Sequence, residues 1–162
     1  VKGVSIHVIC VGKLKEKFYT DASAEYAKRL GGYCKFQLTE LPEERLPDSP
    51  SQAQIDAALR READAILQRL PRGAAVTALC VEGKGLSSEE LSRRMTDWAG
   101  QGRSQLCFVI GSSYGLHPAV KERADLRLSM SKMTFPHHLA RVMLLEQLYR
   151  GFKIAEGSSY HK

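Results

Sequence analysis

Short apolar runs alternate with longer amphipathic segments along this chain. The apolar runs lack a strict apolar–polar alternation, which is typical of strands that are covered on both faces. Strands are predicted in this way at residues 4–11, 35–41, 74–81, 106–110 and 126–130. Because a helical segment or loop separates each strand from the next, the strands are expected to pair in parallel. We therefore predict an α/β fold in which a parallel-type sheet is flanked by helices.

Glycine, proline and capping residues set the bounds of the predicted helices. The helical segments are predicted at residues 16–30, 51–70, 87–99, from 118 onward, and 136–154. Gly31 stops the first helix, and Ser87 with Glu90 has the spacing of a capping box. Pro118 and Pro136 suit the start of a helix, where a missing N–H costs nothing. Three further prolines bracket a charged loop after the second strand, namely Pro42, Pro47 and Pro50.

Composition indicates one globular domain over residues 1–162. Hydrophobic residues make up 43% of the chain and charged residues 26%, which is close to the globular average. Lys13, Lys15 and Glu16 follow the first apolar run closely, so that run is not expected to be a secretion signal. The four cysteines show no C-x-x-C spacing, which predicts buried free thiols. We expect a cytoplasmic protein with no membrane segment and no metal.

Positive charge gathers in the last fifth of the chain. The formal net charge is +6. Residues 130–162 carry half of this excess, together with three of the five histidines. Such an excess suits a polyanion partner such as nucleic acid, although a solvated basic surface explains it equally well.

The last predicted helix is apolar on nearly every side. Its large apolar residues are Val142, Met143, Leu144, Leu145, Leu148, Tyr149 and Phe152. A surface helix needs only one apolar stripe, so this helix is expected to be buried on two sides. The sheet covers one side, and a second copy of the chain is the simplest cover for the other. We predict a homodimer, and a monomer with a deeply buried last helix is the alternative.

Three segments rich in glycine and hydroxyl side chains follow the third, fourth and fifth predicted strands, at residues 81–85, 111–115 and 129–134. Ligands of parallel α/β sheets bind at the carboxyl ends of the strands, so we predict a small-molecule pocket there. The sequence lacks a G-x-G-x-x-G fingerprint after the first strand, a phosphate-binding P-loop and a G-x-S-x-G nucleophile elbow. Spacing alone therefore identifies no ligand.

Several motifs of the carboxyl half closely resemble one family. They are F-V-I-G at 108–111, Y-G-L at 114–116, S-K-M-T-F-P-H at 131–137 and the final Y-H-K at 160–162. Together with the chain length and the order of elements, they resemble the ribosomal RNA large subunit methyltransferase H family. This family belongs to the SPOUT, or α/β-knot, class. It methylates N3 of a pseudouridine in 23S ribosomal RNA with S-adenosylmethionine.

The resemblance implies a C-terminal trefoil knot that spans residues 74–155 and forms the cofactor pocket. It also implies a homodimer that acts on 23S rRNA in the ribosome. By position, the cofactor contacts fall on Leu79, Gly111, Met130, Ser131, Lys132, Met133, Thr134 and Phe135. Two departures from the family pattern are Ser112, where many members have a second glycine, and Ser158–Ser159, where some have His-Pro.

Catalytic roles are predicted for His137, Arg141, Tyr160 and His161. Removal of the N3 proton needs an acceptor, and histidine is the usual one near neutral pH. His138 points away from His137 on the helix and is interpreted as structural. The resemblance implies that Tyr160 and His161 close over the site.

Contacts to RNA are predicted for Arg150, Lys153 and Lys162, because cationic side chains bind phosphates. For Arg150, an ion pair with Glu146 four residues before it is the plainer interpretation. Tyr114 could stack on a base or fill its own turn.

Two other functions stay open from the sequence. The first is a cofactor-binding, ribosome-associated protein without transferase activity, which the two departures from the family pattern would suit. The second is a nicotinamide-dependent enzyme, which the missing fingerprint after the first strand disfavours. A methyltransferase active on 23S rRNA is the function that we predict.

Overall fold

The computed structural model describes residues 3–162. The strands are β1 (Ser5–Val11), β2 (Lys35–Leu41), β3 (Ala75–Gly85), β4 (Gln105–Ile110) and β5 (Leu126–Ser129). The helices are α1 (Lys17–Gly31), α2 (Gln52–Arg69), α3 (Ser88–Gly100), α4 (Pro118–Arg123) and α5 (His137–Ala155). Every predicted strand and helix is present, most with ends within one or two residues of the expected ones.

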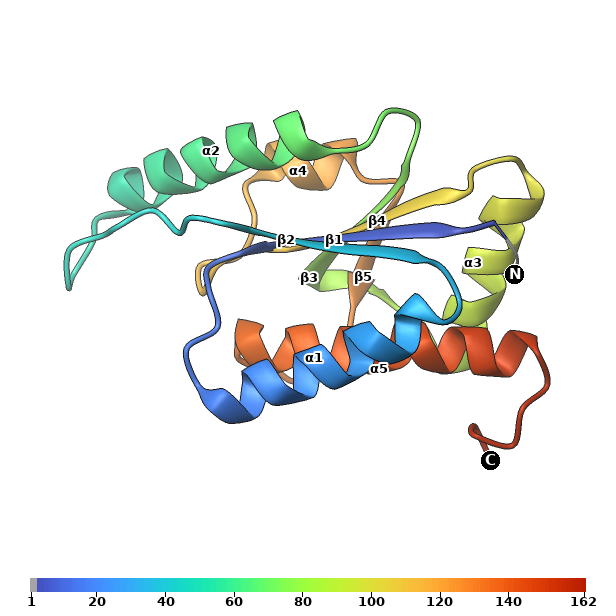
Figure 1. Cartoon of the computed structure of the whole chain (residues 1–162). Coiled ribbons are helices and arrows are strands. Elements are labelled where there is room, and N and C mark those ends of the chain that lie inside the picture. The colour runs from blue at the N-terminus through green and yellow to red at the C-terminus, as the bar shows by residue number, and fades with distance from the viewer. Residues whose placement is uncertain (1–2) are drawn as a thin grey trace.

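One parallel sheet organises the molecule. Its strands lie in the order β2-β1-β4-β3-β5, and every neighbouring pair is parallel. Helices α1, α3 and α5 cover one face of the sheet, and α2 and α4 cover the other (Figure 1). The predicted fold class is confirmed. Since all five strands end at the same edge, the segments that follow β3, β4 and β5 gather there.

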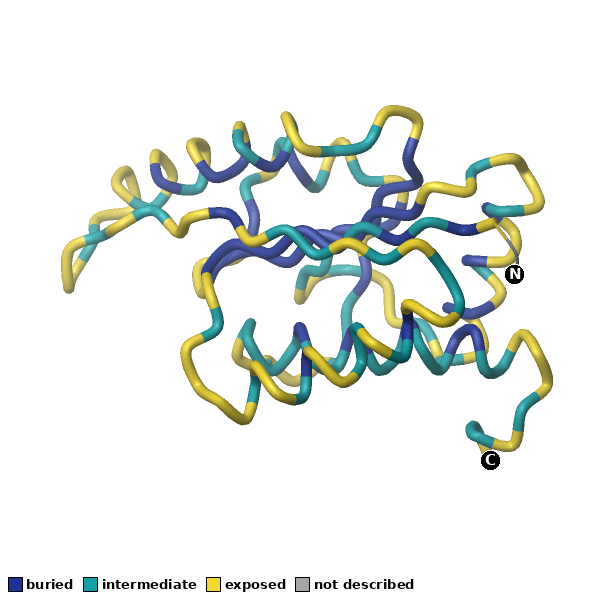
Figure 2. Tube along the Cα trace, viewed as in Figure 1, coloured by how far each residue is buried: buried dark blue, intermediate teal, exposed yellow. Residues whose placement is uncertain are grey.

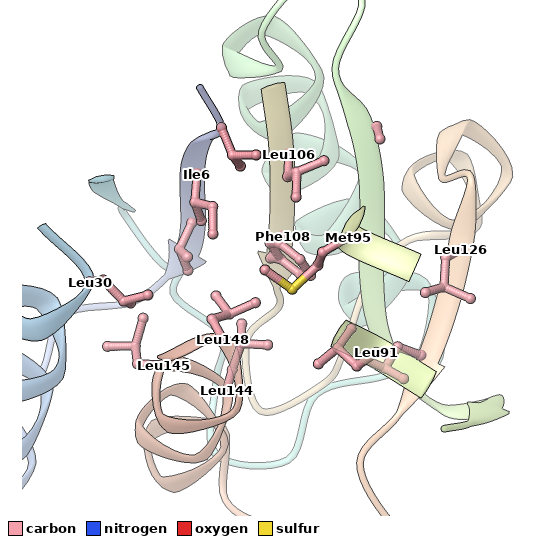
Figure 3. Close-up of a cluster of buried hydrophobic side chains, with 14 of the residues drawn as sticks. Ile6, Leu30, Leu91, Met95, Leu106, Phe108, Leu126, Leu144, Leu145 and Leu148 are labelled. Atoms are coloured by element: carbon pink, nitrogen blue, oxygen red, sulfur yellow. The ribbon is translucent and has the colours of Figure 1, made fainter. Parts of the chain in front are cut away.

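The core has two layers because the sheet is covered on both faces. On the α5 side, Leu144, Leu145 and Leu148 pack toward Ile6 and Phe108 of the sheet (Figure 3). Each such side chain contributes about 1.5–3 kcal/mol through burial. Figure 2 shows the central strands buried, while α1 and α2 keep an exposed outer face. The sheet is therefore a rigid base for the segments at its carboxyl edge.

Local signals explain why the helix starts could be predicted. Ser87 accepts a hydrogen bond from the N–H of Glu90, and the Glu90 side chain accepts one from the N–H of Ser87, which completes the predicted capping box. Pro118 is the first residue of α4, as expected. Pro136 lies just before α5, one residue earlier than a first helical position.

Strand β3 is longer than predicted. We expected a loop over residues 81–85, but the strand continues to Gly85, with a shift in its pairing to β5 between Leu79 and Lys84. At Gly83, a Cβ atom would lie 2.8 Å from backbone atoms of Arg127 and Leu128. Only glycine allows the two backbones to approach this closely. The glycines that suggested a loop therefore mark an irregular strand that is pressed against β5.

Among the helices of residues 3–162, none combines the length and the apolarity that a membrane crossing requires.

Candidate active site

A cavity of about 780 Å³ lies at the carboxyl edge of the sheet. Its walls come from the end of β3, the turn after β4, the segment after β5 and the start of α5. The lining includes Leu79, Cys80, Glu82, Gly111, Ser112, Tyr114, Leu116, Lys121, Met130, Ser131, Met133, Thr134, Phe135 and His137. The three segments that the sequence singled out thus meet in one cavity, whose volume is that of a small-molecule site.

The turn after β4 brings two backbone segments into close contact. A Cβ atom on Gly111 would lie 2.3 Å from the carbonyl oxygen of Gly115, so no other residue fits there. The N–H of Gly115 donates to the carbonyl of Ser112 at 2.8 Å. Among residues 3–162 only glycines have positive φ, so Ser112 is unstrained in the place of a second glycine. The backbone conformation at this departure from the family pattern is one that serine adopts without strain.

The segment after β5 is held by its own hydroxyl groups. The Ser129 hydroxyl donates to the carbonyl of Ser131 at 2.9 Å, and the N–H of Met133 donates to the Ser131 hydroxyl at 3.0 Å. Met133 is 73% exposed although it lines the cavity. Lys132 is exposed and is not among the lining residues. The cavity therefore gathers the predicted cofactor contacts with the exception of Lys132.

An ion pair at the cavity wall was not predicted from the sequence. Glu82 of β3 and Lys121 of α4 form a short contact, and both line the cavity. The hydrogen bond from Lys121 holds the pKa of the Glu82 carboxyl below its usual range. Their separation of 39 residues explains why no local signal could have found the pair.

His137 is the one predicted catalytic residue that lines the cavity. Its ring lies 4.1 Å from the ring of His138, measured between centroids. Burial, and to a smaller extent the neighbouring His138, lowers the pKa of His137. The Nε2 atoms of both histidines are buried without a hydrogen-bond partner. At neutral pH His137 is thus a neutral imidazole.

Arg141 lies beneath this pair and is engaged by other parts of the chain. Its side chain is 2% exposed. Its Nη1 atom donates to Glu40 Oε2 at 2.6 Å, and its Nη2 atom donates to the carbonyl of Gly12 at 3.0 Å. Arg141 does not line the cavity, and these contacts tie α5 to the ends of β1 and β2.

The C-terminal tail folds back onto α3 and α5. The Tyr160 hydroxyl donates to Glu146 Oε2 at 2.8 Å, and His161 contacts Arg150 at 3.0 Å and also Glu89. Burial and the hydrogen bond to Glu146 raise the pKa of Tyr160 to about 12, so its hydroxyl stays protonated. The structure therefore places Tyr160 and His161 away from the cavity wall that His137 occupies.

The residues predicted to bind RNA also lie toward the end of α5. Arg150 pairs with Glu146 at 2.8 Å, as the plainer interpretation of its spacing predicted. Lys153 pairs with Glu156 at 3.2 Å and lies over the rings of Tyr33 and Tyr149. Lys162 is exposed at the chain end.

A second cavity, of about 490 Å³, adjoins the first at Leu128, Ser129 and Met130. It is a groove over α5 between α1 and α3. Its lining includes Tyr26, Leu86, Leu91, Val142, Met143, Glu146 and Gln147. Glu146 also holds Tyr160, so the tail lies beside this groove rather than beside His137.

The arrangement suits the binding of a small molecule. The lining of the larger cavity mixes apolar side chains with backbone groups and hydroxyls, which suits a ligand with a flat apolar ring and a polar chain. The neutral His137 is available to accept a proton.

Comparison with known proteins agrees with the family resemblance found in the sequence. A family model described as "Predicted SPOUT methyltransferase" matches residues 4–161. Proteins named Ribosomal RNA large subunit methyltransferase H from Limosilactobacillus reuteri and Streptococcus suis are each 46% identical over 159 residues, which is 98% of this chain and 100% of theirs. The protein of that name from Clostridioides difficile is 45% identical over the same span.

Among solved structures, a probable methylase family protein from Haemophilus influenzae matches with a TM-score of 0.52 and 13% identity. The match covers 99% of this chain and 71% of that one. At this identity the likeness concerns the fold alone.

Proposed function

This chain belongs to the SPOUT methyltransferase family, and from that premise we propose that it methylates N3 of a pseudouridine in 23S ribosomal RNA, with S-adenosylmethionine as methyl donor. One observation carries the proposal. The segments after β3, β4 and β5 form a single cavity of about 780 Å³, and the residues that match the family's cofactor motif line it, Lys132 excepted. Its volume and mixed lining fit an adenosine and a methionine chain.

The chain's own residues position the two reactants. Leu79, Met130 and Phe135 offer an apolar surface for a flat ring, and the turn at Gly111 leaves its backbone open to the cavity. S-adenosylmethionine, when bound, supplies a methyl group on a positively charged sulfur. Methyl transfer removes that charge, so a site that orients both partners and excludes water favours the reaction.

We propose His137 as the group that accepts the N3 proton within one chain. It lines the cavity, and burial lowers its pKa, so it is neutral at pH 7. Arg141 acts as a positioning residue, because its contacts with Glu40 and Gly12 fix the start of α5. Within one chain Tyr160 and His161 lie beside the groove over α5, so the role that the family resemblance supports for them is to close over the site of a partner subunit.

We further propose a homodimer through the groove over α5. Val142 and Met143 are only half-buried although α5 is apolar around most of its surface. A second copy that covers the groove would bury them and would lie beside the Ser129–Met130 wall of the cofactor cavity. Sedimentation of the purified protein measures this directly, and a monomer at all concentrations would contradict it.

We also propose that residues 74–155 form a trefoil knot. The match to the SPOUT family over residues 4–161 supports it, because the resemblance to this class implies such a knot.

Methyl transfer to ribosomes tests the proposed function. Ribosomes from cells that lack the modification are incubated with the protein and radiolabelled S-adenosylmethionine, and the 23S rRNA is digested to nucleosides. We expect label in N3-methylpseudouridine. Ribosomes that already carry the modification are the control and should take up none. Absence of label from 23S rRNA would contradict the proposal and would leave a binding protein without transferase activity.

A further inference from the structure

One large hydrophobic side chain is exposed outside the cofactor cavity. Among the residues that the structure describes, three of the four exposed large hydrophobic residues line that cavity, namely Val81, Tyr114 and Met133. The fourth, Phe18, is 66% exposed and does not line it. Phe18 lies in the first turn of α1, and Figure 1 shows that α1 and α5 begin at the same end of the molecule. It therefore faces solvent at the end of the molecule that holds the cofactor cavity.

A row of aromatic rings joins Phe18 to the wall of this cavity. The ring centroids of Phe18 and Tyr19 are 4.5 Å apart, and those of Tyr19 and His138 are 6.2 Å apart. The ring of His137 follows at 4.1 Å from that of His138, and His137 lines the cavity. Neighbouring rings at such separations pack against each other. An extended ligand that continues from the cavity past His137 over these rings would therefore meet Phe18.

Exposed lysines precede Phe18 in the chain. Lys13 and Lys15 lie in the loop between β1 and α1, Lys17 is the first residue of α1, and all three are exposed. Lys17 pairs with Asp21 at 2.6 Å. Lys13 and Lys15 form no ion pair with any residue in the described part of the chain. Their ammonium groups are therefore available to an anionic partner.

The acidic residues beside this loop lie against the two histidines. The Glu16 carboxylate lies 4.0 Å from Nδ1 of His138. A Cβ atom on Gly12 would lie 3.5 Å from the Glu43 carboxylate and 3.7 Å from Nε2 of each histidine, so Glu43 lies against the same pair of rings. Lys13 and Lys15 are thus left without a counter-charge of their own.

Hydrogen bonds hold the loop that carries these lysines. The N–H of Gly12 donates to the carbonyl of Leu41 at 2.8 Å, and the carbonyl of Gly12 accepts from Arg141 at 3.0 Å. The N–H of Leu14 donates to Glu40 Oε2 at 3.3 Å. A loop that is fixed in advance loses little conformational freedom when it binds a partner, which favours affinity.

Resting on the proposed function, we propose that Phe18, Lys13 and Lys15 bind the single-stranded rRNA that adjoins the target nucleotide. Bases of single-stranded RNA stack on aromatic side chains, and lysine ammonium groups bind the phosphates between them. The target base enters the cavity beside His137, and a neighbouring base stacks on Phe18 at the outer end of the row of rings. This surface holds the RNA and takes no part in methyl transfer.

The lysines favour RNA over a second copy of the chain as the partner of Phe18. A second copy would cover the ring by apolar contact and would gain nothing from two unpaired ammonium groups beside it, since lysine is depleted in contacts between proteins. Phe18 is also not among the residues that line the groove over α5, where we propose the dimer contact. RNA uses both the ring and the positive charges.

Two substitutions of Phe18 separate stacking from simple apolar contact. Phe18→Trp keeps an aromatic ring, whereas Phe18→Leu keeps an apolar side chain without one. The assay is methylation of ribosomes that lack the modification. We expect Phe18→Leu to raise KM for ribosomes about fivefold or more through the loss of one stacked base. Its kcat should be unchanged, because Phe18 lies outside the cavity, and Phe18→Trp should keep the wild-type KM.

The salt dependence of ribosome binding tests the lysines. Each contact from a lysine to a phosphate of single-stranded RNA contributes about 0.7 to the slope of log Kd against log salt concentration. Lys13→Gln combined with Lys15→Gln should therefore lower this slope, as measured by co-sedimentation with unmodified ribosomes. Lys35→Gln serves as the control, because Lys35 is an exposed lysine at the start of β2, at the opposite edge of the sheet. It should keep the wild-type slope.

The outcomes separate this proposal from the proposed function. If the wild type methylates no 23S rRNA, the proposed function fails and this inference fails with it. If the wild type is active while Phe18→Leu keeps the wild-type KM, or while the double lysine variant keeps the wild-type slope, the assignment of this surface is wrong although the function stands. Sedimentation of Phe18→Leu as a monomer, where the wild type is a dimer, would also overturn it and would place Phe18 in the subunit contact. Calorimetric binding of S-adenosylmethionine checks that each variant is folded and should match the wild type.

Discussion

Arg141 combines almost complete burial with a permanent charge. An unpaired buried charge is strongly destabilising, so the contacts of Arg141 are needed to offset the free-energy cost of its burial. Glu40 supplies the compensating charge at 2.6 Å, and the Gly12 carbonyl accepts a further hydrogen bond at 3.0 Å. The sequence predicted a catalytic role for Arg141, and nothing near it in the sequence indicates a partner that lies 101 residues earlier.

Removal of a partner from this buried pair gives the first stability prediction. We expect Glu40→Gln to lower the free energy of unfolding by about 3 kcal/mol, because it leaves Arg141 buried without its counter-charge. Chemical denaturation measures the change. Glu25→Gln is the control, since it removes only a solvent-exposed pair with Arg29 on α1 and should leave the free energy of unfolding almost unchanged. Similar losses in the two variants would show that burial of Arg141 is energetically unimportant.

The irregular end of β3 is the decisive feature at the scale of elements. A Cβ atom at Gly83 would meet the β5 backbone at 2.8 Å, whereas one at Gly85 would meet nothing within 4 Å. We expect Gly83→Ala to force the two strands apart and to cost about 1–3 kcal/mol of stability. Leu128 and Met130 would shift with β5, so binding of S-adenosylmethionine should weaken as well.

Gly85→Ala is the matched control for this prediction. It adds the same atom two residues further along the strand and should leave both unfolding and cofactor binding near the wild-type values. Thermal unfolding and calorimetry on the two variants give the comparison. If Gly83→Ala matched Gly85→Ala in thermal stability and in affinity for S-adenosylmethionine, the close approach of β3 and β5 would contribute neither to stability nor to cofactor binding.

Local signals predicted most elements, and long-range contacts explain what was missed. The capping box at Ser87 and Glu90 and the proline at the start of α4 act within one helical turn, so the sequence reveals them. The continuation of β3 depends on pairing with β5, more than 40 residues later along the chain, and its glycines read locally as a loop.

Long-range contacts also limit how much of the site could be predicted from the sequence. The three segments at the carboxyl edge were found because parallel strands end at one edge. The Glu82–Lys121 pair joins residues from separate elements, and no spacing rule connects the two.

At the scale of the whole molecule, the order of the strands in the sheet determines where the cavity forms. Placing β4 and β3 between β1 and β5 brings three carboxyl ends together with the start of α5, and the resulting cavity combines the cofactor motif with His137. The basic excess of the chain, +6 overall, suits a ribosomal surface as the larger partner. Neither the strand order nor a knot follows from periodicity, because periodicity records which residues face the core and not which strands are neighbours.

The central claim is that this cavity binds S-adenosylmethionine, and calorimetric titration tests it most directly. We expect the wild type to bind S-adenosylmethionine and to give no signal with NAD. Gly111→Ala should bind at least about tenfold more weakly, because its new atom would displace the turn at Gly115. Gly31→Ala, whose new atom meets nothing within 4 Å, should bind like the wild type. No binding of S-adenosylmethionine by the wild type, or equal binding by the Gly111 variant, would contradict the account.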